Sequence, residues 1–221
     1  MSVKSIPYGL ADYKLLVEDG CAYVDKTMYI RSLEQAEYYA LFLRPRRFGK
    51  SLFASMLGYY YDIARKDNFD LLFSGTDIGR NPTPRKNSYY ILKFNFSDVE
   101  TSSDEILLES FTGKVYDALL GFRNTYKLDF TLEKDRPAEQ LTAFFTEFQR
   151  ISDGKIYVII DEYDNFANLA TPRVGEKTSP LLTSRRDLKH DYLAACSLNP
   201  ISEDTTIWGY HAYSRRGEVC T

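Results

Sequence analysis

Two short segments of this chain carry residues whose types and spacing suit phosphate chemistry. Residues 44–51 read Arg-Pro-Arg-Arg-Phe-Gly-Lys-Ser, which matches the loop pattern G-x-x-x-x-G-K-[ST] at every fixed position except the first. In such a loop backbone N–H groups surround phosphate oxygens, the lysine neutralises their charge and the hydroxyl binds Mg²⁺. Further along, Asp161 and Glu162 directly follow the apolar run 156–160. Together the two segments predict a site for ATP and magnesium.

We call residues 44–51 the phosphate loop. The pattern predicts that ATP is bound by this loop and the residue after it, through Arg46, Arg47, Phe48, Gly49, Lys50, Ser51 and Leu52. Arg44 replaces the first glycine, which normally relieves backbone strain and allows close approach of the phosphates. The alternative is that Gly49, Lys50 and Ser51 merely start a helix, with the serine as cap and the lysine in solvent. Arg46 and Arg47 could contact phosphates, reach a neighbouring subunit or lie in solvent.

Asp161 and Glu162 predict how the same site binds a metal ion and activates water. A carboxylate fixed at the end of a hydrophobic strand can hold Mg²⁺, so Asp161 is predicted as a metal ligand together with Ser51. Glu162 is predicted as the catalytic base that orients and deprotonates the attacking water. The alternative is that both acids are solvated residues just beyond a strand.

The elements that must position these residues alternate between strands and helices. Apolar runs predict strands at 39–43, 89–96 and 156–160, and helical spacing predicts helices at 26–35 (capped by Asp25 or Thr27), from 52 to about 65, at 107–119 and at 141–151. Strands separated by helices imply right-handed crossovers and a parallel sheet. We therefore expect an α/β, three-layer sheet of the P-loop NTPase type, of the class that carries a glutamate beside the magnesium-binding aspartate.

The last part of the chain differs in character. Beyond residue 168 prolines interrupt the sequence, serine and threonine increase, and no apolar run matches those upstream. A sheet of the expected kind needs two more strands, so either this tail supplies them in disguise or the fold is incomplete at the C-terminus. We therefore divide the chain into a P-loop domain, 1–168, and an atypical tail, 169–221, that either supplies the missing strands or is a truncated or frameshifted product.

Composition narrows the function class further. The 221 residues carry a formal net charge of −3, which gives no bulk basic excess for non-specific nucleic-acid binding. The sequence contains no stretch apolar enough to cross a membrane and no apolar leader at its start, so we expect a cytoplasmic protein. Three scattered cysteines and two histidines predict neither a disulfide framework nor a histidine-based metal site.

These motifs resemble a bacterial family of proteins with an AAA-ATPase-like domain, whose function is largely unknown. The resemblance covers about residues 5–168, and it rests on four segments of the sequence: Ile6-Pro7-Tyr8-Gly9 with Asp12-Tyr13, Tyr23-Val24-Asp25-Lys26-Thr27, Arg-Pro-Arg-Arg-Phe-Gly-Lys-Ser-Leu at 44–52, and Asp161-Glu162-Tyr163-Asp164. In that family an arginine is usual where other loops have the first glycine, which makes Arg44 resemble a family trait. By the same analogy, residues 25–27 belong to a segment that passes near the adenine in related ATPases.

The resemblance implies a Mg-dependent ATPase with ATP as its ligand. Family members often continue into a domain similar to PD-(D/E)XK nucleases, which residues 169–221 do not match, so nucleic acid enters as a partner only through this analogy. No sequence feature supports an oligomer. The rival hypothesis is a non-hydrolysing fragment or interaction module that keeps the nucleotide fold without turnover.

Overall fold

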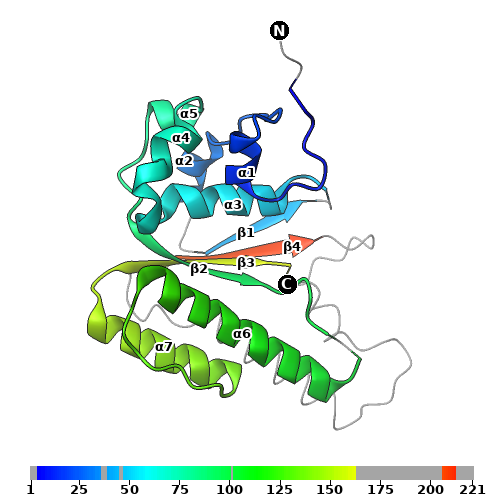
Figure 1. The fold of residues 1–221 in the computed structure, drawn as a ribbon, viewed down its shortest axis with the longest axis vertical. Helices are drawn as coiled ribbons and strands as arrows, with labels where there is room; N and C mark the ends of the chain where they lie inside the picture. The colour runs from blue at the N-terminus through cyan, green and yellow to red at the C-terminus, as the bar shows by residue number, and fades with distance from the viewer. Residues whose placement is uncertain (1–3, 36–38, 45–46, 101, 163–205, 213–221) are drawn as a thin grey trace.

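A computed structural model describes residues 4–35, 39–44, 47–100, 102–162 and 206–212 of the chain. These residues form an α/β fold around one parallel sheet with the strand order β1-β4-β3-β2 (Figure 1). The strands are β1 (Tyr39–Arg44), β2 (Tyr89–Asn95), β3 (Lys155–Asp161) and β4 (Thr206–Ala212). All four carboxyl ends therefore lie at the same edge of the sheet, where ligands bind in open α/β folds.

Helices cover both faces of this sheet (Figure 1). One face carries α1 (Tyr13–Glu18), α2 (Tyr29–Glu34), α3 (Lys50–Tyr61), the 3₁₀-helix η1 (Ile63–Asn68), α4 (Phe69–Phe73) and α5 (Asp77–Arg80); the other carries α6 (Asp104–Tyr126) and α7 (Pro137–Ile151). Right-handed crossovers require this arrangement, because the connections from β1 to β2 and from β2 to β3 run in opposite directions across the sheet. None of the helices among the described residues is long and apolar enough to span a bilayer.

Strand β3 divides the hydrophobic core into two layers. Ile156, Val158 and Ile160 pack with the aromatic and aliphatic side chains of α6 and α7. Tyr157 and Ile159 point the other way and pack with the buried face of α3. Successive side chains of a strand alternate between faces, so a continuous apolar run is what a strand buried on both sides requires.

The predicted strands and helices are found, with shifted boundaries. The helix expected to reach residue 65 ends at Tyr61, because Asp62 is extended and its carboxylate accepts a hydrogen bond from the N–H of Ala64, which starts η1. The helix expected at 26–35 is α2, and its N-cap is Met28 with no side-chain hydrogen bond. The capping roles predicted for Asp25 and Thr27 are therefore wrong, because both side chains bind a different helix, as described below.

Strand β4 corrects the interpretation of the tail. No apolar run after residue 168 indicated a further core strand, yet Thr206–Ala212 lies between β1 and β3 and pairs in parallel with both. The tail thus supplies one further strand that its sequence pattern did not indicate, which was one of the two alternatives. Its sequence, Thr-Ile-Trp-Gly-Tyr-His-Ala, contains a glycine and two polar residues instead of an apolar run. The segment forms a strand because the two neighbouring strands supply hydrogen-bond partners for its backbone.

Candidate functional site

Lys50 is the first residue of α3 and is buried, with 7% of its surface exposed. The residue before it, Gly49, is the N-cap and has a left-handed backbone with φ 74°. Arg47 also has a positive φ, 66°, although it is not a glycine. Left-handed residues beside a helix N-terminus turn successive N–H groups towards one side, and such concavities favour anions. The alternative of a solvated lysine at a simple helix start does not agree with the burial of Lys50.

The remaining predicted loop residues surround this helix start. Phe48 is 56% exposed and Arg47 is exposed, while Ser51 is half-buried in the first turn of α3. Ser51 is not the helix cap, since Gly49 holds that position. Leu52 is half-buried and packs on the core beneath α3, so its contribution to the site is structural support. Arg46 lies outside the described residues, as do Tyr163 and Asp164.

Asp161 ends β3 at the edge of the sheet from which the phosphate loop leaves β1. The strand register pairs Leu41 with Gly209 and Gly209 with Ile160, so Asp161, one residue further, is level with Phe42. Only β4 separates the two strands, and two strand spacings amount to about 10 Å. By the alternation of side chains along β3, Asp161 belongs to the same face as Tyr157 and Ile159, the face on which α3 packs.

The surroundings of Asp161 suit a cation. The residue is 3% exposed, and its Oδ1 has no hydrogen-bond partner among the described residues. An ionised carboxylate buried in this way is costly unless a cation or its water satisfies the oxygen. No cluster of three or more acidic, histidine or cysteine ligands exists in the described part of the chain. The alternative of a solvated acid does not apply to Asp161.

Glu162 follows immediately and differs from Asp161 in its setting. Its backbone is left-handed, with φ 57°, and its side chain is half-buried. A non-glycine residue in this region carries some strain, which turns the chain sharply at the end of β3. Glu162 thus directly follows the buried Asp161 but keeps part of its surface exposed.

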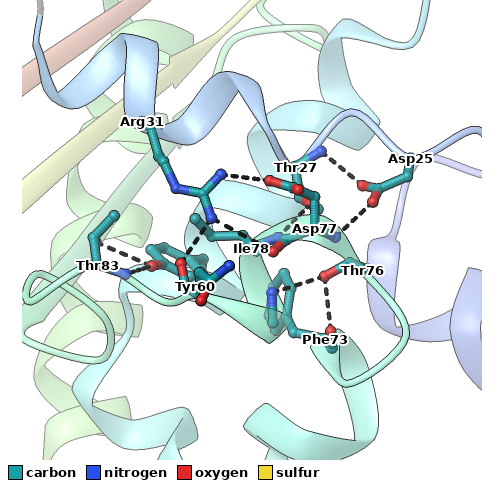
Figure 2. Close-up of polar contacts among 11 residues, drawn as sticks. Asp25, Thr27, Arg31, Tyr60, Phe73, Thr76, Asp77, Ile78 and Thr83 are labelled. Atoms are coloured by element: carbon teal, nitrogen blue, oxygen red, sulfur yellow. Dashed lines mark hydrogen bonds and ion pairs between the residues drawn. The ribbon is translucent and has the colours of Figure 1, made fainter.

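A polar network anchors the segment before β1 to the start of α5 (Figure 2). The Asp25 carboxylate accepts hydrogen bonds from the N–H groups of Thr27 at 2.8 Å and Asp77 at 2.7 Å, and the Thr27 hydroxyl accepts one from the N–H of Ile78 at 3.1 Å. Burial opposes ionisation of Asp25, but the hydrogen bonds from Thr27 and Asp77, with Arg80 nearby, outweigh it and lower its pKa below the usual range. Asp25 and Thr27 are therefore structural anchors.

Lys26, between these anchors, approaches the phosphate loop. A Cβ atom placed on Gly49 would lie 3.9 Å from the Lys26 ammonium. The sequence pattern gave no reason to associate Lys26 with the phosphate end of the site, and the family analogy associated its segment with the adenine. The sequence feature that could have indicated this role is the position of Lys26 between two polar residues, Asp25 and Thr27, in the motif at 23–27.

Comparison with known proteins identifies a family. The model of a family described as predicted AAA-ATPase matches residues 7–193. A protein of Azotobacter chroococcum mcd 1, described as an uncharacterized protein in the vnfD 5' region, is 27% identical over 182 residues, which are 80% of this chain and 33% of that protein. The chain thus spans about a third of the length of that relative. No solved structure matches the chain.

Proposed function

Because the chain belongs to the family of predicted AAA-ATPases, we propose that it binds Mg·ATP in a P-loop NTPase fold and hydrolyses it slowly. The nucleotide-binding part is residues 1–168, joined in the sheet by β4, and its place is the cytoplasm. The proposal goes beyond the family description in assigning the site residues. ATP would be bound by the phosphate loop and the first turn of α3, with Asp161 and Glu162 at the neighbouring strand end.

The observation that carries the proposal is the burial of Lys50 at the start of α3. A lysine is seldom buried unless an anion or another partner offsets the free-energy cost of removing its ammonium from water. Here it stands at a helix N-terminus, where the N–H groups and the helix dipole also favour negative charge. The left-handed Gly49 gives the turn that brings the loop backbone close to a ligand.

In this proposal each residue has a separate task. Lys50 neutralises the terminal phosphates, and Ser51 and Asp161 would hold Mg²⁺ through the hydroxyl and the buried carboxylate. The ion, when bound, neutralises charge on the phosphate oxygens. Glu162 orients a water and accepts its proton, a role that its half-buried position next to Asp161 supports. The Arg47 guanidinium, exposed on the loop, adds positive charge for the phosphates.

One observation favours the rival, a module that binds nucleotide without turnover. Arg44 is the last residue of β1, at the position where the loop pattern has a glycine. The loop must therefore leave the strand without the freedom that glycine gives, and its shape could suit binding better than the transition state.

Two measurements test the proposal. Isothermal titration calorimetry with Mg·ATP should give a binding isotherm for the wild type and none for Lys50→Ala, and a cooperative thermal transition should move upwards with Mg·ATP. Release of inorganic phosphate, abolished in Glu162→Gln, then separates an ATPase from the non-hydrolysing module. A wild type that shows neither binding heat nor a thermal shift would overturn the proposal.

A further inference from the structure

The segment that carries Lys26 is fixed on both sides of this residue. Thr27 is completely buried, and its hydroxyl accepts the N–H of Ile78, while Asp25 accepts the N–H of Asp77 (Figure 2). Asp25 also accepts the N–H of Thr27, which closes a tight turn around Lys26. The backbone of Lys26 therefore has little freedom, although its own side chain takes no part in this network.

A second set of contacts ties α2 to α5. Arg31 forms an ion pair with the carboxylate of Asp77 (Figure 2). It also donates a hydrogen bond to the carbonyl of Asn81 at 2.8 Å. The Thr27 carbonyl accepts the N–H of Ile30 at 3.0 Å, which connects the turn directly to α2. The turn is thus held between two helices and is a rigid base for the Lys26 side chain.

From this base Lys26 reaches the last loop residue before α3. Its ammonium lies 3.9 Å from the Cβ position at Gly49, and the side chain is half-exposed. Among the described residues no carboxylate lies within 4.0 Å of this ammonium. Asp25 and Thr27 therefore hold the Lys26 ammonium next to Gly49, and no carboxylate of the described residues neutralises it.

We propose that Lys26 is a second phosphate-binding cation of the site, supplied from outside the phosphate loop and acting beside Lys50 on the terminal phosphates of the nucleotide. This inference rests on the proposed function. Gly49 is the N-cap and directly precedes Lys50, so the Lys26 ammonium lies beside the turn that leads into Lys50. The Asp25 and Thr27 side chains are positioning residues that act through Lys26.

The test compares Mg·ATP and Mg·ADP binding by calorimetry in Lys26→Met, Lys26→Arg and the control Lys66→Met. Lys66 is an exposed lysine in η1, beyond the far end of α3, so its loss removes one charge at a distance from the site. We expect Lys26→Met to weaken ATP binding about tenfold, the equivalent of one charge-assisted hydrogen bond, and to weaken ADP binding less. Lys26→Arg should stay within about threefold of the wild type, and Lys66→Met should be unchanged.

The possible failures are distinguishable. If the wild type does not bind Mg·ATP, the proposed function itself fails. If the wild type binds, Lys50→Ala does not, and Lys26→Met retains wild-type affinity for both nucleotides, the role of Lys26 is overturned while the proposed function stands. A Lys26→Met variant that loses ATP and ADP affinity equally and also melts at a lower temperature without nucleotide would show a structural role, which equally overturns the inference.

Discussion

Replacing Lys50 by methionine removes its charge and keeps most of the volume of its side chain. Because Lys50 is only 7% exposed, the aliphatic stem belongs to the packing around the start of α3, and Met fills that space better than Ala. A hydrogen bond to a charged group contributes about 1.5–3 kcal/mol to binding. Because Lys50 is buried, we expect its contribution to lie near the upper end of this range. The expected loss is therefore about 100-fold in the affinity for Mg·ATP.

The same loss can be followed by thermal unfolding. At an ATP concentration of 100 times the dissociation constant, a ligand stabilises the folded state by about 2.7 kcal/mol, which corresponds to a shift of about 5–10 °C for a chain of this size. For a variant that binds 100-fold more weakly, the same concentration only equals its dissociation constant, and the shift falls to about 1 °C. Lys66→Met provides the control, with the full wild-type shift.

Calorimetry decides the question directly, with melting in the absence of nucleotide as the check on folding. If Lys50→Met folds and binds Mg·ATP within about threefold of the wild type, the reasoning from its burial is wrong, since a charge lost at the phosphates cannot cost so little. The phosphate loop would then have to be assigned another role.

The remaining predictions concern the strand end and the anchoring network. Asp161→Asn should remove the dependence of ATP binding on Mg²⁺, and without magnesium it should melt no lower than the wild type, since it removes a buried charge whose Oδ1 has no hydrogen-bond partner in the described part of the chain; a lower midpoint in EDTA would contradict this. Glu162→Gln should bind Mg·ATP normally but release phosphate at least about 100-fold more slowly, and unchanged turnover would exclude Glu162 as the base. The pKa of Asp25 is lowered by folding despite its partial burial, so the ionised carboxylate stabilises the fold above its unfolded pKa, and this contribution is lost as the pH falls through the lowered folded pKa. Asp25→Asn should therefore melt lower than the wild type at pH 7, and the difference should diminish in acid melts; a constant difference at every pH would refute this assignment.

The sequence predicted most of the described part of the fold because its elements repeat simple patterns. The apolar runs at 39–43 and 156–160 correspond to β1 and β3. For β3 the reason is that a strand buried on both faces needs apolar residues at every position. The spacing of Leu107, Phe111, Val115 and Leu119 corresponds to α6, whose buried side faces the sheet. The short helices α1, α4 and α5 were not predicted, because four to six residues are too few to show a helical period.

What the sequence determined by itself is the order of the chemical groups: a glycine, lysine and serine after one buried strand, and an aspartate and glutamate after another. Only the tertiary structure decided how these groups are surrounded. Strand β4 lies between β1 and β3 because its partners lie on both sides, which no pattern within Thr206–Ala212 specifies. Likewise, Asp161 is buried, with an Oδ1 that has no partner among the described residues, and Lys26 lies beside Gly49 only when distant segments pack, since burial and proximity are properties of the whole fold and not of any local sequence.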